Sequence, residues 1–440
     1  MMFSSFPRLR AGRRPAVLTS GLVLVLAALS SGPALAASTD IQLWHSLDAH
    51  NRQVFETLVK QFNRQSKTTQ VRLSAYKDQA GVDAALARIS QDKDRPHLVQ
   101  LPEHYDPDVL ARRSYIQPLH VLMGKHPLRG FEWFLPAENR AVRDAKGRLL
   151  AFPYMLDIPV MYYNQDAFRK AGLQPPVPER SWSGLQAQLV TAANNGSRRC
   201  PLTSDQSVSV NLENLAAVNN QPYAKPARKG AAPAFDFDVM YIRHLSLMIS
   251  WVRSELMVKP EFNAVAAERF AKGECAVLMS QSSRLGWFAA QRSLNVGIDG
   301  LPYYPEVTRT PGLAFVGGSA LWATRGHAKL EDVSVMEFLG WLAQAEQAAT
   351  WFEQTGFLPV SRQGFEAARA SGALMKQWHA MAAPYGKKPV ATAQGFQIRN
   401  YPEIRAMFTR SLDGALSGKG TAVTTLKAAA AEGSRMAGQK

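Results

Sequence analysis

Short apolar strands alternate with amphipathic helices early in the sequence, and this alternation restricts the fold more than any other feature. Residues 41–46 (IQLWHS) form an apolar strand, and residues 51–67 carry apolar side chains at helical spacing. The same order continues with a strand at 71–76, a helix at 82–92 and a buried strand at 97–101. Strand, helix and strand in alternation predict a doubly wound α/β domain.

A second α/β stretch begins at residues 159–163, where an apolar strand passes directly into a helix. Asn164 supplies the short acceptor side chain of an N-cap, and Gly172 suits the position after the helix end. The chain of 440 residues is long enough for two or three domains. We therefore expect two lobes, with the chain leaving the first between Leu150 and Asp157, a candidate hinge.

The later sequence contains further elements of the same kind. Residues 317–324 (GGSALWAT) predict a strand that begins at a glycine pair, and residues 330–356 predict two amphipathic helices. Residues 357–362 (FLPVSR) indicate another crossing between the lobes. A final helical region is expected from Pro402 onward.

The first 36 residues have the composition of a signal peptide. Four arginines precede an apolar run, and Ala34 and Ala36 form a small-x-small cleavage site. We expect cleavage near Ala36 and a soluble, exported mature chain, by general secretion or, with Arg13 and Arg14, by the twin-arginine route. Loss of these arginines lowers the formal charge from +16 to +12. The remaining basic residues are scattered among acids without aromatic interleaving, so no nucleic-acid partner is expected.

Two cysteines, Cys200 and Cys275, are too few for a disulfide-built scaffold. In an oxidising compartment they can pair; otherwise they are two separate buried thiols. A disulfide between them would close a loop of 76 residues (275 − 200 + 1), which stabilises by about 4 kcal/mol in the chain-entropy model.

The sequence shows no motif for catalysis or metal binding. The nine histidines lack metal-ligand spacing, there is no G-x-S-x-G, and residues 414–419 fall one residue short of a phosphate-binding loop. We therefore expect no catalytic residues, no metal and no cofactor. His45, Ser46, Tyr76 and Glu103 follow directly after strands, where ligands bind in α/β sheets. Single polar and aromatic residues at such loops are typical of a non-catalytic solute site.

Several motifs carry a family resemblance over essentially the whole mature chain. They are LWHSL, YYNQDAFRKAGL, SWSGL, NLENLAAVNNQPYA, GECAVLMSQSS, VGGSALW, TGFLPVS and NYPEIR. In order and spacing they resemble the periplasmic glycerol-3-phosphate-binding proteins of ABC importers. The YYNQDAFRKAGL motif alone is similar to the wider family of extracellular solute-binding proteins, which includes maltodextrin binders.

The resemblance implies a two-lobed α/β periplasmic binding protein fold of type II. Each lobe would be a doubly wound sheet flanked by helices, with a hinge between the lobes. The implied ranges are a signal peptide at 1–36, an N-terminal lobe at 37–152 with about 298–355, and a C-terminal lobe at about 157–297 with 356–440.

Position by position, the family's ligand pocket falls on Glu103, Trp182, Gly318 and Arg405. The resemblance implies that Glu103 accepts from glycerol hydroxyls and that Trp182 packs on the polyol. Gly318 permits a close backbone approach, and Arg405 offers a bidentate fork to phosphate. The residues alone leave three alternatives open: Glu103 is an exposed, ion-paired residue, Trp182 is a core residue, and Arg405 is a surface residue.

The chain departs from the family pattern at four places. A family tyrosine falls near Ala80, with Tyr76 close by. Serines become Asp157 and Gln281, with Ser282 retained next to the latter, and the tyrosine of TGYLP becomes Phe357. A carboxylate beside a phosphate pocket repels a dianion. We therefore expect a glycerophosphodiester, such as glycerophosphocholine with its choline against Asp157, or another polyol to be preferred over glycerol-3-phosphate.

The function implied is that of a monomeric periplasmic substrate-binding subunit. It would deliver a glycerol-phosphate type solute to membrane permease subunits driven by a cytoplasmic ATPase. The alternative is an oligosaccharide- or polyol-binding protein of the same fold, favoured if Trp182, Phe357, Tyr162 and Tyr223 line an uncharged cleft. A secreted hydrolase would need a nucleophile with its base or paired carboxylates, for which the sequence offers no candidate.

Overall fold

The computed structural model describes residues 38–89, 91, 94–102, 107–195, 199–225, 233–260 and 265–439. Residues 38–440 form one compact unit. The predicted signal peptide, residues 1–36, lies outside the described residues. Within the described ranges, no helix combines the length and the apolar character that a membrane span requires.

The strands belong to two separate sheets. They are β1 (Thr39–His45), β2 (Thr69–Ala75), β3 (Leu98–Pro102), β4 (Ile116–Gln117), β5 (Phe152–Asp157), β6 (Pro159–Asn164), β7 (Cys200–Ser204), β8 (Cys275–Gln281), β9 (Val296–Asp299) and β10 (Gly317–Thr324). The predicted strands at 159–163 and 317–324 are confirmed as β6 and β10.

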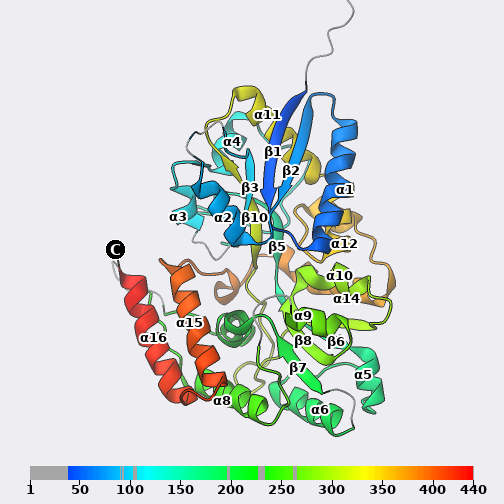
Figure 1. Ribbon diagram of the computed structural model, residues 1–440, viewed down its shortest axis with the longest axis vertical. Coiled ribbons are helices and arrows are strands. Elements are labelled where there is room, and N and C mark those ends of the chain that lie inside the picture. Colours follow the sequence, from blue (N-terminus) through cyan, green and yellow to red (C-terminus); the bar gives the residue numbers. More distant parts are fainter. Residues whose placement is uncertain are drawn as a thin grey trace, which may run out of the picture. The chain divides into compact units, whose positions relative to one another are not determined.

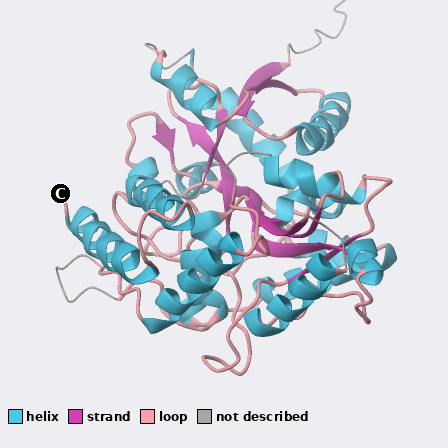
Figure 2. Ribbon diagram, turned by 60° about the horizontal axis from the view of Figure 1, so that its bottom comes forward, coloured by secondary structure: helices cyan, strands magenta, loops and turns pink. Residues whose placement is uncertain are grey.

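Helices flank both sheets (Figures 1 and 2). They are α1 (Ala49–Gln65), α2 (Gln79–Ala87), α3 (Pro107–Ala111), α4 (Leu119–Lys125), α5 (Gln165–Lys170), α6 (Trp182–Asn194), α7 (Asn214–Val218), α8 (Val239–Arg253), α9 (Val265–Ala271), α10 (Leu285–Ala289), α11 (Lys329–Leu342), α12 (Ala345–Thr355), α13 (Arg362–Ala367), α14 (Gly372–Ala382), α15 (Tyr401–Leu416) and α16 (Ala422–Gly438). Short turns are the π-turn η2 (Ser209–Glu213) and the 3₁₀ turns η3 (Ser282–Arg284), η4 (Ala383–Gly386) and η5 (Ala391–Ala393).

The first sheet has the order β2-β1-β3-β10-β4, and β5 also pairs with β10. β1 runs parallel to β2 and β3, as the alternation of strands and helices predicts. β10 runs antiparallel to β3, β4 and β5, so the sheet is mixed. α1 packs against β2, and α11 packs against β1 and β2, because their apolar stripes face the sheet.

The second sheet has the order β7-β8-β6-β9 and is also mixed. β7 and β8 are parallel, whereas β6 is antiparallel to β8 and β9. α6 packs against β7, and α5 and α9 pack against β8. A disulfide joins Cys200 to Cys275, which lie directly opposite each other at the starts of β7 and β8.

The turn from β6 into α5 follows the predicted capping. The Asn164 side chain accepts from the backbone N–H groups of Asp166 and Ala167, at 3.0 and 3.2 Å. Gly172 adopts a φ of +82°, which a residue with a Cβ rarely takes. Local capping therefore accounts for the abrupt change from strand to helix.

The chain passes from the first sheet to the second with a single residue, Ile158, between β5 and β6. The segment 150–157, which we expected to be the hinge, is mostly the buried strand β5 paired with β10. Residues 357–362 do not form a strand, but the Leu358 N–H donates to the Leu156 carbonyl at 2.7 Å, beside this passage. How the chain divides into lobes stays a prediction.

Candidate ligand-binding site

One cavity is lined by residues from both sheets and from the C-terminal region. The space inside it, about 710 Å³, includes open solvent. Pro159 and Gln281 come from the second sheet, Gly317 comes from the first, and Tyr401 and Arg405 come from α15. The other lining residues are Pro107, Arg140, Ala141, Ser209, Glu213, Asn214, Phe315, Val316, Gly395, Phe396, Gln397 and Ile398.

A π-turn places Glu213 in the cavity wall. Asn214, directly after η2, donates to the Ser209 carbonyl at 3.1 Å and accepts from the Phe315 N–H at 2.6 Å. These bonds fix the wide turn and tie it to the chain that approaches β10. π-helical turns are rare, and those that occur are often found at functional sites.

Glu213 accepts two hydrogen bonds on one oxygen. The Tyr401 hydroxyl and the Arg405 Nε both donate to its Oε1, the latter at 2.9 Å. The Tyr223 hydroxyl lies 2.9 Å from that of Tyr401 and extends the network into the core. The Glu213 side chain is only 10% exposed and that of Arg405 26%, so this ion pair is largely shielded from water. Burial raises the pKa of Tyr401 and of Tyr223 well above their usual range.

Asp157 lies at the end of β5, directly opposite Gly317 of the cavity wall. Its Oδ2 accepts from the Ser283 hydroxyl at 2.6 Å, whereas its buried Oδ1 has no hydrogen-bond partner among the described residues. Burial raises the pKa of Asp157 to about 7, against the lowering effects of Ser283 and Arg284. The negative charge of Asp205 raises it further.

Asp205 and Gln281 are further acceptors near Asp157, and Gln281 lines the cavity. Asp205 Oδ2 accepts from the Ser280 hydroxyl at 2.9 Å and lies 4.0 Å from the Arg284 guanidinium. Gln281 donates to the Gln206 side-chain oxygen at 3.2 Å. In the described part of the chain, Asp205 Oδ1 and Gln281 Oε1 are buried without a donor, like Asp157 Oδ1. Such oxygens are costly to bury unless a donor reaches them.

The structure brings some of the predicted site residues to the cavity. Gln281 and Arg405 line it, and Asp157 is paired with the lining residue Gly317. Gly318 follows in β10 with a φ of +97°, and a Cβ there would lie 2.5 Å from the Met155 carbonyl oxygen. Glu103 lies outside the described residues.

Other predicted site residues are not among those that line the cavity. Trp182 is 1% exposed and packs in the core against His244, with ring centroids 4.6 Å apart. Phe357 stacks on Trp351 at 5.2 Å, and Tyr76 packs on Trp44 at 5.3 Å. The Ser282 hydroxyl donates to the Gly356 carbonyl at 2.7 Å.

The aromatic residues proposed for an uncharged sugar cleft are likewise buried. Trp182, Phe357, Tyr162 and Tyr223 are each at most 5% exposed. The aromatic side chains that line the cavity are Phe315, Phe396 and Tyr401. The first two carry no local motif that could have identified them, and Glu213 was missed because its partners lie about 190 residues away in the sequence.

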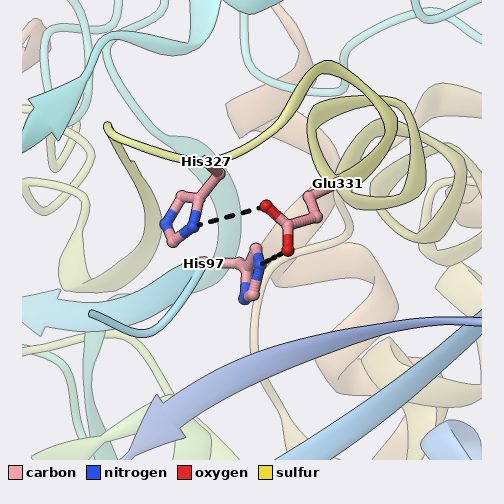
Figure 3. A group of neighbouring side chains, drawn as sticks. All are labelled: His97, His327 and Glu331. Carbon is pink, nitrogen blue, oxygen red and sulfur yellow. Dashed lines mark ion pairs between the residues drawn. The ribbon is translucent and has the colours of Figure 1, made fainter. Parts of the chain in front are cut away.

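A second polar group, His97, His327 and Glu331, lies between the start of β3 and the first turn of α11 (Figure 3). The His97 Nδ1 accepts from the Gln42 N–H at 3.0 Å, so the neutral ring carries its proton on Nε2, facing Glu331 at 3.7 Å. The His327 Nε2 lies 2.7 Å from the Thr324 hydroxyl, which donates to the Pro96 carbonyl. The ring therefore donates from Nε2 and leaves Nδ1 as a lone pair.

This bonding pattern limits the group as a metal centre. His327 Nδ1 and the Glu331 carboxylate are ready donors of electron pairs, whereas His97 presents an N–H. Protein zinc sites use three or four ligands, each with a lone pair on the metal. We therefore interpret the group as a hydrogen-bonded cluster at the N-terminal end of β3.

Two β-sheets flanked by helices, with a cavity lined from both and combining polar, charged and aromatic side chains, are typical of a solute receptor. Residues 57–383 match the model of the bacterial extracellular solute-binding protein family, and the chain belongs to that family. It is the substrate-binding protein of an ABC importer, which implies permease partners, and it is a transport receptor rather than an enzyme.

Named relatives and solved structures agree with this assignment. The chain is 27% identical to the sn-glycerol-3-phosphate-binding periplasmic protein UgpB of Escherichia coli K12 and 28% identical to that of Salmonella typhimurium, over 95% of this chain and 96% of each relative. It is similar to UgpB from Mycobacterium tuberculosis in complex with glycerophosphocholine (TM-score 0.72, 18% identity, 91% and 99% of the two chains). It is equally similar to maltose-bound MalE3 of T. maritima (0.72, 16%, 90% and 98%). These structural likenesses show the fold.

Proposed function

We propose that this protein binds a glycerophosphodiester, such as glycerophosphocholine, in the periplasm and delivers it to the permease subunits of its importer. The relatives named for glycerol-3-phosphate and the similar structure with glycerophosphocholine support this class of solute. An N-terminal signal peptide cleaved near Ala36 would direct the chain there.

The observation that carries the proposal is the presence of both charge types at one cavity. Arg140 and Arg405 line it and can attract a phosphate. Asp157, beside the lining residue Gly317, has a buried oxygen without a donor among the residues that the structure describes. A phosphodiester with a cationic head group would bring a negative charge to the arginines and a positive charge to Asp157, as electrostatic complementarity requires.

Calorimetric titration of the refolded mature protein with glycerol-3-phosphate, glycerophosphocholine and maltose tests the proposal. Unfolding and refolding first removes any carried-over solute. We expect micromolar binding of glycerophosphocholine, weaker binding of glycerol-3-phosphate and no heat with maltose. Silence towards both phosphate esters would overturn the proposal.

The variant Asp157→Ser tests the role assigned to the carboxylate. Removing the charge should weaken glycerophosphocholine about tenfold and strengthen glycerol-3-phosphate, because the dianion no longer meets a carboxylate. Asp413→Asn, an exposed carboxylate paired with Lys259, is the matched control. An unchanged order of the two esters in Asp157→Ser would contradict the role of Asp157.

An oligosaccharide or another polyol is the second candidate solute. Phe315 and Phe396 line the cavity and offer apolar faces of the kind on which sugar rings pack. Their ring centroids lie 5.2 Å apart at an angle of 78°, so they form a corner rather than one flat platform. Binding of maltose without either ester would favour this candidate.

A further inference from the structure

The charged residues of the cavity wall are few, and one of them opposes the other two. Among the described lining residues, Arg140 and Arg405 are cationic and Glu213 is anionic. Their formal charges sum to +1, and Asp157, paired with the lining residue Gly317, adds negative charge when it is ionised. A solute with two negative charges therefore carries more charge than this wall can neutralise.

Glu213 acts on the same guanidinium that is the strongest candidate for phosphate binding. Its Oε1 accepts from Arg405 Nε at 2.9 Å, and both side chains are largely shielded from water. Water screens such a pair poorly, so the carboxylate lowers the positive potential that a phosphate meets at Arg405. The bond also occupies the Arg405 Nε–H, which is then not available to a phosphate.

Tyr401 makes this arrangement rigid. Its hydroxyl donates to the same Oε1, and Tyr401 and Arg405 lie one helical turn apart in α15. Glu213 itself is fixed by the π-turn η2. The carboxylate cannot move away when a phosphate approaches without breaking bonds to both residues of α15, so its charge stays at the site.

We propose that Glu213 is a positioning residue that makes this cavity select singly charged phosphodiesters over doubly charged phosphomonoesters. The inference rests on the proposed function and adds to it a residue that sets the charge of the accepted phosphate. A phosphomonoester loses its second proton near pH 6 and is mostly a dianion at pH 7.5, whereas a diester keeps one negative charge. The choice between them is then made by charge at the phosphate, independently of any cationic head group.

The test compares glycerol-3-phosphate with its methyl diester, which has the same glycerol but one negative charge and no cation. Both are titrated calorimetrically at pH 7.5 into the mature wild-type protein and into Glu213→Gln. Glutamine keeps an oxygen to accept from Tyr401 and Arg405 and removes the charge. Glu132→Gln is the control, because Glu132 is 72% exposed, pairs with Arg362 and does not line the cavity.

We expect the wild-type protein to bind the methyl diester more tightly. In Glu213→Gln, the affinity for glycerol-3-phosphate should rise about tenfold relative to the diester, and raising the salt concentration should weaken the monoester more than in wild type. The Glu132→Gln ratio should equal that of wild type.

Three results would overturn the inference. One is an unchanged ratio in Glu213→Gln with both esters still bound, which leaves the proposed function intact. Another is tighter binding of glycerol-3-phosphate than of the methyl diester by the wild-type protein, which decides the matter even if the variant does not fold. The third is absence of binding of either ester to wild type, which removes the proposed function as well.

Discussion

Glu213 and Asp157 are both buried carboxylates at the same cavity, yet their surroundings differ. Glu213 accepts from a tyrosine and an arginine and is held by a π-turn. Asp157 accepts from one serine, keeps a buried oxygen without a donor among the described residues, and has a pKa raised to about 7. A carboxylate whose partners are all in the protein supports structure and positioning. Under the proposed function, the cation of the solute would supply the partner that Asp157 lacks among the described residues.

The largest expected effect is on stability when Glu213 is removed. Glu213→Ala deprives Tyr401 and Arg405 of a shared buried acceptor, so the free energy of unfolding should fall by about 3–5 kcal/mol. Urea denaturation followed by circular dichroism measures it. Glu132→Ala, which breaks only an exposed ion pair with Arg362, should change it by less than about 1 kcal/mol. Equal losses in the two variants would mean that the Glu213 network is not the stabilising one.

Removal of the Asp157 charge should stabilise the protein at high pH, whereas removal of Glu213 should destabilise it. Folding raises its pKa from 3.8 to about 7, so the folded state binds this proton more tightly than the unfolded chain. The resulting stabilisation is complete below about pH 4 and is lost as the pH rises through 7. Asp157→Asn should therefore be more stable than wild type at pH 8, by up to about 4 kcal/mol, and should lose this advantage at pH 4.

Urea denaturation at the two pH values measures this difference, with Asp413→Asn as the exposed control. If Asp157→Asn is less stable than wild type at pH 8, the carboxylate has a donor in the folded protein in addition to Ser283.

The smallest expected effect is a transfer of protons on binding. A cationic head group beside Asp157 would lower its pKa, so at pH 7 about half a proton should be released per glycerophosphocholine bound. Titration in two buffers of different ionisation enthalpy measures the release. It should disappear in Asp157→Ser and be smaller for the methyl diester, which has no cation. Equal release for both solutes would place the cation away from Asp157.

Local signals in the sequence were sufficient for much of the fold. The caps at Asn164 and Gly172 and the glycine pair that starts β10 each depend on residues within one turn of each other. The antiparallel entry of β10 into the first sheet was not predictable, because β10 lies more than 200 residues from β3 and nothing local sets its direction.

Residues that line the cavity were predictable only where a motif carried them, and their role in binding stays a prediction. Arg405 and Gln281 were placed at the cavity through the resemblance, whereas Glu213 stood unnoticed inside the motif NLENLAAVNNQPYA. Trp182 shows the converse. A tryptophan that begins a helix can lie in the core or in the pocket with the same local sequence, and only the packing of His244 and Trp251 against it decides.

The single residue between β5 and β6 has a consequence for every affinity measured at this site. Asp157 and Pro159, which flank Ile158, are the last and first residues of strands in different sheets, and Pro159 also lines the cavity. If the sheets rotate about this connection, the rotation takes place in the backbone torsion angles of Ile158. A solute in the cavity would then lie within one residue of the axis of rotation. A substitution of Asp157 or Pro159 would then change two quantities at once: the strength of a contact with the solute and the free-energy cost of rotating the sheets towards each other. Association and dissociation rates, rather than equilibrium constants, would separate them.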